Sequence, residues 1–452
     1  MTDTDHKTGA AEALMLMLVP AATVHIVCAS FGLSFAFPFK IYIGAVLAFC
    51  LADDIRSRSG PFAARLRSYA SSLRAAEIVA FAAAILAIFG AWAVNRHPGA
   101  KSLNEAGGFL LAVMGIGSFL RRVNDPVRFA VRMLQIIAAL AVVQCVISAI
   151  HCRAEVFAAV SGSVTAVDYI KTSWKASFLY SNPNSFGFYM MAGGSAAWAL
   201  AVRYLLIGER RRFAASVCAA AVCAFGILLS ASRASMFGFG VAVAFTLCLP
   251  PVLKAGFSAI RRRPVKSALL AAFFAAACIF LFHNYIDTFT RKFDNGTIYR
   301  SAFWSQLFED PSRHGAIDVV TASRYSFWRG FLAQQAESFP SADFFFGRGN
   351  FRPINPVDPG MELHNVYLEI WGKYGLFCAA ALAVFLVLCV RKACLRREFV
   401  FLAGVGAAFM LHGCFEDKIF VNSLHPQLLY LYTALLVPVC AAPPDGKTRV
   451  RS

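Results

Sequence analysis

Long apolar runs alternate with short polar segments along the whole 452-residue chain. Most runs approach the ~20 residues that an α-helix needs to cross a bilayer. The pattern predicts about twelve spans, at 12–32, 35–52, 76–94, 107–120, 130–150, 186–207, 213–231, 234–252, 267–285, 366–390, 399–414 and 427–442. We therefore predict an all-α polytopic membrane protein in which residues 1–452 form one integral membrane domain.

Composition and charge support this class. Hydrophobic residues make up 58% of the chain and charged residues 15%, against about 25% charged residues in a typical soluble domain. With the N-terminus inside, the cytoplasmic segments hold 26 Lys and Arg against 9 Asp and Glu, whereas the outer segments hold 15 against 14. This is the positive-inside pattern, which places both termini in the cytoplasm and explains the net charge of +18 without a nucleic-acid partner.

The longest segment outside the predicted spans is the outer loop 286–365, which precedes the last three spans. It contains Trp304, Trp328 and many Phe residues, so it is too apolar for a disordered tail. We expect it to cover the outer face with short helices, one of them within "AIDVVTASRYSFWRGFLAQQAESF".

Polar side chains gather where this loop enters the next span, in "MELHNVYLEIWGKYG". His364 and Asn365 stand at the predicted start of a helix, whose free N–H groups and positive dipole end suit phosphate oxygens. Tyr367, Trp371 and Tyr374 share one helical face. They form either an aromatic platform for a ligand or an interfacial aromatic belt.

Arginines at the same outer face suggest a chemistry. Arg233, Arg324 and Arg348 have the planar fork that holds a diphosphate leaving group, and His364 suits the base that activates a sugar hydroxyl. The alternative for Arg233 is a side chain that reaches from a helix end to the interface. The alternative for Arg348 is a side chain that faces solvent in a tight glycine turn.

Other motifs point away from metal and nucleotide chemistry. The chain has no acidic pair of the DxD type on the outer side, and no Walker, GxSxG or HExxH motif. Its thirteen Cys show no CxxC and no metal-ligand spacing with His. We predict neither a metal site nor a cofactor.

Four elements, in this order, resemble the O-antigen ligase and polymerase superfamily of bacterial inner-membrane glycosyltransferases: "SNPNSFGFYM", "SASRASMFGFG", "FFFGRGNF" and "LHNVYLEIWGKYG". The resemblance covers roughly residues 180–440. It implies a multi-pass protein of the inner (cytoplasmic) membrane whose active site faces the periplasm. Its members transfer a glycan from a polyprenyl-diphosphate-linked donor.

The resemblance also implies roles for single residues. His364 would be the base or position the acceptor hydroxyl, Arg233 would hold the diphosphate and Arg324 would assist it. Arg348, Asn365 and Tyr367 are expected to bind substrate. Asn182 and Asn184 are either further binding residues or parts of a turn that starts a helix.

The acceptor stays open. Ligases use lipid A-core, polymerases use a second carrier-linked glycan, and related members glycosylate proteins. After the His-Asn element, ligases commonly continue with Gly-x-x-Gly followed by Thr residues. This chain has Gly375-Leu-Phe-Cys378 followed by Ala379 and Ala380, which weakens the ligase interpretation relative to the polymerase one. We place ligase first and polymerase second. A transporter or flippase of lipid-linked sugars and a structural scaffold are the readings from other classes.

Overall fold

The computed structural model describes residues 12–17, 36–95, 100–151, 183–230, 232–262, 324–347, 363–414 and 426–441. Across these residues the chain is helical and contains no strand, which confirms the all-α prediction for the described part. The elements are α2 (Ala36–Arg56), α3 (Phe62–Ser72), α4 (Ala75–Asn95), α5 (Ala100–Arg122), α6 (Pro126–His151), α9 (Pro183–Ile207), α10 (Arg210–Ser230), α11 (Arg233–Leu247), α12 (Pro250–Arg262), α16 (Arg324–Glu337), α17 (Ala342–Phe346), α18 (Val366–Leu395), the 3-10 helix η2 (Arg397–Leu402), α19 (Ala403–Gly413) and α21 (Pro426–Cys440).

Apolar helices long enough to cross a membrane are present. Among the described residues, four segments pass this test: Leu103–Arg122, Pro126–Ile150, Ser185–Ile207 and Val366–Leu395. Two bent pairs, α3 with α4 and α11 with α12, raise the number to six if each pair is one span. The protein is therefore a helical membrane protein, whereas twelve spans and cytoplasmic termini stay predictions. The predicted span 267–285 lies outside the described residues, and 12–32 is described only at 12–17.

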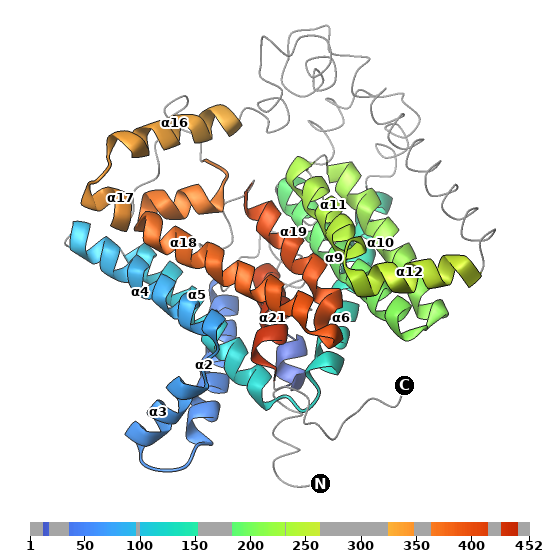
Figure 1. Ribbon diagram of the computed structural model, residues 1–452, viewed down its shortest axis with the longest axis horizontal. Helices are drawn as coiled ribbons and strands as arrows, with labels where there is room; N and C mark the ends of the chain where they lie inside the picture. Colours follow the sequence, from blue (N-terminus) through green and yellow to red (C-terminus); the bar gives the residue numbers. More distant parts are fainter. Residues whose placement is uncertain are drawn as a thin grey trace, which may run out of the picture.

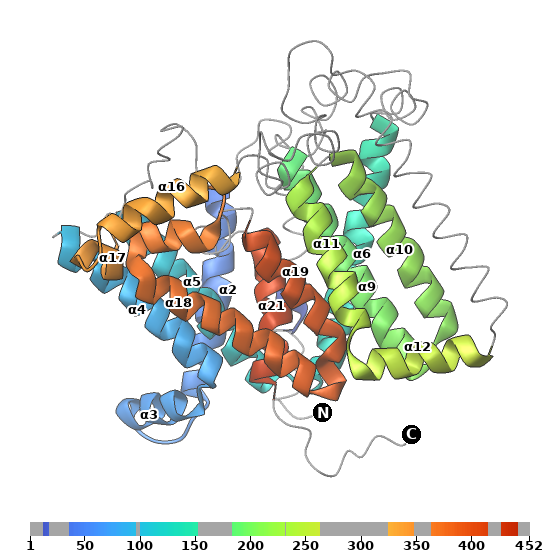
Figure 2. The ribbon, with the colours of Figure 1, turned by 45° about the horizontal axis from the view of Figure 1, so that its top comes forward.

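The helices form two groups with α19 and α21 between them (Figure 1). In one group α18 packs along α4, α2 packs on α5, and α16 and α17 lie beside the first half of α18 (Figure 2). In the other group α9 packs against α6, α10 and α11. Helix α19 contacts both α11 and α18, so it joins the two groups.

Small residues allow this close packing. Ala80, Ala83, Ala84 and Ala87 of α4 are all fully buried, and α4 packs against α18. Small residues at such spacing let membrane helices approach, because no hydrophobic effect drives helices together in lipid. On α4, large apolar side chains point outward instead, among them Phe81, which is 46% exposed. This division on α4, with small residues inside and large residues outside, suits a helix that faces lipid on one side.

Three features differ from the sequence prediction. Helix α11 ends at Leu247, and after a bend of 77° the chain continues as α12, where the sequence predicts one span over 234–252. Helix α3 lies in a segment for which no helix was predicted. Helix α5 starts at Ala100, before the predicted 107, and thus includes the polar Glu105, which is buried and accepts a hydrogen bond from the Tyr374 hydroxyl at 2.6 Å.

Candidate functional site

The start of α18 is fixed by Asn365. Its side-chain oxygen accepts hydrogen bonds from the backbone N–H groups of Tyr367 (3.1 Å) and Leu368 (3.2 Å). Asn is a preferred N-cap because a helix leaves its first N–H groups without backbone partners. Asn365 is 8% exposed. Its first role is therefore to cap the helix, and its predicted role in substrate binding stays a prediction.

His364 directly precedes this cap and has an unusual backbone. Its φ is 49°, and no other non-glycine residue among those that the structure describes has a positive φ. Such a conformation costs energy for a residue with a Cβ, and it gathers at functional sites because the surrounding structure holds it there. Leu363 on its other side is fully buried, and its carbonyl oxygen accepts a hydrogen bond from Trp328 Nε1 at 2.9 Å. The backbone of His364, which is itself partly exposed, is thus held from both sides.

The α16–α17 segment forms a cap over the first half of α18. Trp371 Nε1 of α18 donates a hydrogen bond to the carbonyl oxygen of Phe344 at 3.0 Å. Its ring also meets Phe331 and Phe344 edge to face, with centroids 5.9 Å and 5.2 Å apart. This aromatic contact anchors the described part of the outer loop to α18, as the sequence predicts for a loop that packs on the membrane domain.

Two glycines allow the backbones of α17 and α18 to approach each other closely. Helix α18 is kinked at Gly375, whose φ is 85°, and a Cβ there would overlap the carbonyl of Phe345. A Cβ on Gly347, which ends α17 with a φ of 74°, would likewise overlap the backbone of Lys373. Glycine is needed where the backbone has a positive φ and approaches another chain segment closely. Gly347, the first glycine of the "FGRGNF" element, is therefore part of the contact between the cap and α18; Arg348 and the rest of this element lie outside the described residues.

The start of α9 packs on the turn between α10 and α11. A Cβ on Gly187 would lie 2.6 Å from Ser230 Oγ and 3.0 Å from Ser235 Oγ. The Oγ atoms of Ser232 and Ser235 are 2.9 Å apart, and both residues are buried. The "SNPNSFG" and "SASRAS" elements, about fifty residues apart in the sequence, are thus in direct contact through Gly187.

Helix α19 connects this contact to α18. Phe188 of α9 lies against His412 in the last turn of α19, with ring centroids 4.7 Å apart. In the same turn, the carbonyl oxygen of Met410 accepts a hydrogen bond from the Tyr367 hydroxyl at 3.0 Å. His412 is 3% exposed, and the sequence analysis missed it. The signal was present, because an ionisable residue inside a predicted span usually faces the interior of the bundle.

Two of the three predicted arginines begin helices at this end of the molecule. Arg233 is the first residue of α11 and Arg324 the first residue of α16; their side chains lie outside the described set, as does that of Asn184 in α9. Arg324 stands one turn before Trp328, which bonds the residue preceding His364. Asn182 is not described. The backbone thus brings Arg324 near His364, and Arg233 near the start of α9.

The three aromatic residues of α18 do not form a common platform. The hydroxyl of Tyr367 bonds α19, the indole of Trp371 bonds α17, and the hydroxyl of Tyr374 bonds Glu105 of α5. Tyr374 is 1% exposed, so it cannot present its ring to a ligand. Among the described residues, no cluster of three or more His, Cys, Asp or Glu could hold a metal ion.

Comparison with known proteins yields one family match. Residues 218–383 match the model of a family described as O-antigen ligase. The matched range includes Arg233, Arg324, Arg348 and the His364–Asn365 element, whereas Asn182 and Asn184 precede it. No curated protein matches the chain.

Proposed function

The match supports membership of the chain in the O-antigen ligase family, and from this premise we propose that the protein is a membrane glycosyltransferase of the O-antigen ligase type. It transfers a glycan from a polyprenyl-diphosphate-linked donor to lipid A-core at the periplasmic face of the bacterial inner membrane. The main structural support is His364, which is held in a positive-φ conformation where the cap of α16 and α17 meets α18. Strain that the fold maintains at one polar residue favours a site over a passive loop.

In the proposed step, the acceptor hydroxyl gives its proton to the imidazole of His364, and its oxygen attacks the anomeric carbon of the donor glycan. The bond from that carbon to the diphosphate oxygen breaks, and its electron pair leaves with the polyprenyl diphosphate. Arg233, Arg324 and Arg348 stabilise the charge that develops on this leaving group. Attack from the face opposite the diphosphate inverts the anomeric carbon. The step as written uses neither a metal ion nor a cofactor.

The buried surroundings of the site suit this chemistry. A base works best when its ring is oriented before the substrate arrives, because the binding energy then need not be spent on ordering the site. Of the two neighbours of His364, Leu363 is bonded to Trp328 of α16, and Asn365 is bonded to the first turn of α18 that it caps. The lipid of the donor would remain in the bilayer while its glycan lies outside, which is why the polar residues would stand where a membrane helix begins.

A polymerase is the second candidate, because the chain lacks the second glycine and the threonines that follow in ligases. Cys378 occupies the position of that glycine. It is fully buried, and its Sγ donates a hydrogen bond to the Ala83 carbonyl oxygen of α4 at 3.3 Å. It also lies in the half of α18 that follows the kink at Gly375, whereas His364 precedes the other half. This difference from the ligase pattern thus lies in the contact between α18 and α4 rather than beside His364, and it is compatible with either acceptor.

The test is glycan transfer by the purified protein in lipid vesicles. One polyprenyl-diphosphate glycan is supplied with lipid A-core or, separately, with a second carrier-linked glycan. A glycan on lipid A-core supports a ligase, and a lengthened carrier-linked glycan supports a polymerase. His364→Ala and His364→Gln should both lose transfer, whereas Arg391→Ala, at the far end of α18, should keep it. Transfer that survives in both His364 variants would contradict the proposed base.

A further inference from the structure

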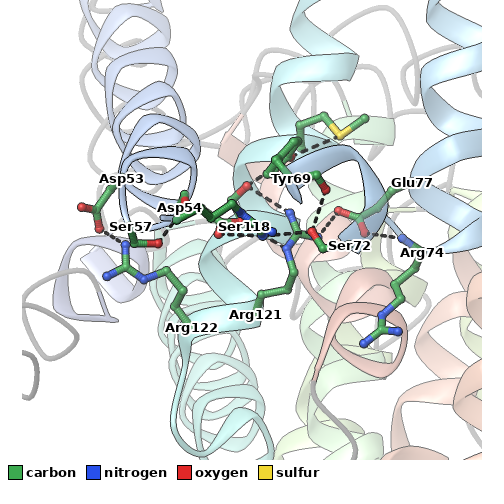
Figure 3. Close-up of polar contacts among 12 residues, drawn as sticks. Asp53, Asp54, Ser57, Tyr69, Ser72, Arg74, Glu77, Ser118, Arg121 and Arg122 are labelled. Carbon is green, nitrogen blue, oxygen red and sulfur yellow. Dashed lines mark hydrogen bonds and ion pairs between the residues drawn. The ribbon is translucent and has the colours of Figure 1, made fainter. Parts of the chain in front are cut away.

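A buried network of charged groups ties α2, α4 and α5 together at one end of the bundle (Figure 3). The guanidinium of Arg121 in α5 pairs with Asp54 of α2 at 3.2 Å and with Glu77 of α4 at 2.6 Å. Glu77 is fully buried, and its second oxygen accepts a hydrogen bond from the backbone N–H of Arg74 at 2.9 Å. Because each carboxylate oxygen in this network has a donor, its charges are compensated and the three helices are held in one arrangement.

The same network holds one face of α3. Arg58 donates hydrogen bonds to the Ser68 carbonyl oxygen at 2.6 Å and to Ser72 Oγ at 2.9 Å. Tyr69 is buried, accepts a hydrogen bond from Ser118 Oγ at 3.2 Å, and lies under the guanidinium groups of Arg58 and Arg121. Helix α3 is bent by 110° from α4 and lies across this end of the bundle (Figure 2). These contacts of Tyr69, Ser68 and Ser72 therefore fix the rotation of α3 about its own axis.

The first two turns of α3 carry exposed apolar side chains on the same side as Tyr69, with basic residues nearby. Phe62 is 70% exposed and Leu66 is 40% exposed, one helical turn apart. Arg67 is exposed beside them, and Arg56 and Arg74 are exposed at the two ends of the segment. None of these three arginines forms an ion pair with another residue that the structure describes. The chain from residue 55 to residue 76 contains no Asp or Glu, so the surface carries only positive charge.

We propose that α3 is an interfacial helix that binds the anionic phospholipid headgroups of the leaflet at this end of the bundle. An interfacial helix buries its apolar face at the boundary between headgroups and acyl chains, and its basic residues attract anionic lipids. Because α3 connects the apolar helices α2 and α4, it lies close to the surface of the bilayer that these helices cross. Phe62 and Leu66 enter the acyl boundary, and Arg56, Arg67 and Arg74 contact phosphate groups.

The proposal differs from a flexible basic loop in one respect. The ion pairs of Arg121 and the hydrogen bonds of Arg58 set the rotation of α3 before any lipid binds. A pre-set helix loses little conformational freedom on binding, which favours lipid contact at defined positions. The inference does not depend on the transfer reaction, because lipid binding is measured without donor or acceptor.

The first experiment locates the lipid. The full protein carries photoreactive benzoylphenylalanine at position 66 or, as a matched control, at position 71, where exposed Ser71 lies on the polar side of α3. It is placed in nanodiscs of phosphatidylcholine and phosphatidylglycerol and irradiated, and adducts are identified by mass spectrometry. Position 66 should form acyl-chain adducts and position 71 should not. Equal adducts at both positions, or none at position 66, would overturn the proposal; adducts to another protein would favour a protein partner instead.

The second experiment tests the charges. Detergent-solubilised protein is titrated with phosphatidylglycerol or phosphatidylcholine, and the thermal unfolding midpoint is recorded. Each arginine near an anionic surface strengthens binding by about fivefold, so the combined Arg56→Gln, Arg67→Gln and Arg74→Gln variant should lose most of the phosphatidylglycerol-dependent shift.

The matched control is a second variant with Arg391→Gln, Lys392→Gln and Arg397→Gln, which removes three exposed charges near the end of α18. It should keep the shift. An equal loss in both variants would show general charge attraction and overturn a site on α3, as would a shift that phosphatidylcholine produces equally well.

Discussion

The hydroxyl of Tyr367 donates a hydrogen bond to the carbonyl oxygen of Met410, 3.0 Å away. This bond connects the first turn of α18, which directly follows His364 and Asn365, to the last turn of α19. That turn also carries His412, which lies against Phe188 near the start of α9. A single side chain therefore links the two halves of the candidate site, and the bond is open to a direct test.

Tyr367→Phe removes the hydroxyl and keeps the ring. We expect the variant to lose about 1 kcal/mol of stability, because the carbonyl of Met410 loses a donor in a partly buried place. Glycan transfer should fall about fivefold if the same free energy is lost from the positioning of His364. Reversible unfolding in mixed micelles and initial transfer rates measure the two effects.

Tyr430→Phe is the matched control. The Tyr430 hydroxyl is buried and has no hydrogen-bond partner among the described residues, so its removal should cost nothing measurable and leave transfer unchanged. If both variants lost the same stability, the bond between Tyr367 and Met410 would not be the cause.

Two substitutions at position 364 separate the strain of the backbone from the loss of the imidazole. The positive φ of His364 is unfavourable for residues with a Cβ and neutral for glycine. We expect His364→Gly to be more stable than His364→Ala by about 1 kcal/mol, although both lose the imidazole and with it glycan transfer. Unfolding midpoints of the two variants, measured beside their transfer rates, test this. An alanine variant as stable as the glycine variant would mean that the backbone at position 364 is not strained.

Much of the helical framework could be predicted from hydrophobicity alone. Helix α6 (Pro126–His151) and α9 (Pro183–Ile207) lie where the apolar runs at 130–150 and 186–207 predict them. Such runs fix helices because backbone groups in lipid must bond within their own segment. Helix α16 (Arg324–Glu337) likewise lies where helical spacing predicts a helix in the outer loop.

The missed features depend on contacts between distant segments. Arg121 and Glu77 are 44 positions apart, and nothing local to either residue indicates that they pair. The charge pattern therefore includes Arg121 only among the basic residues of the cytoplasmic segments. Helical spacing places Tyr374 in either an aromatic platform for a ligand or an interfacial aromatic belt, yet its partner is Glu105, 269 positions away. Periodicity gives the face of a helix, and only the fold gives what that face touches.

Gly375→Ala should disrupt the attachment of the cap to α18. A Cβ would overlap the carbonyl of Phe345, and alanine disfavours the φ of 85°. We expect a loss of at least about 2 kcal/mol, from strain and the displaced α17 together, and faster limited proteolysis between α16 and α18.

Gly107→Ala provides the comparison. A Cβ at Gly107 in α5 meets no atom within 4 Å, so alanine should stabilise the helix by up to about 1 kcal/mol through its higher helix propensity. Opposite signs for the two glycine substitutions would confirm the close contact between the cap and α18, and a neutral Gly375→Ala would refute it.

The buried ion pair at the far end of the bundle predicts a large cost of its own. Glu77→Gln leaves the guanidinium of Arg121 with one carboxylate fewer in a buried place, and breaking a buried pair by removing one partner costs about 3–5 kcal/mol.

The matched control is Glu209→Gln, which removes the same charge from an ion pair with Arg212 in which the two side chains are 41% and 65% exposed. Exposed pairs contribute at most about 1 kcal/mol, because water and salt screen them. Unfolding of the two variants at low and high salt should therefore show a large, nearly salt-independent loss for Glu77→Gln and a small, salt-sensitive one for Glu209→Gln. Equal losses would mean that water reaches Arg121 and that the network does not hold α3 in place.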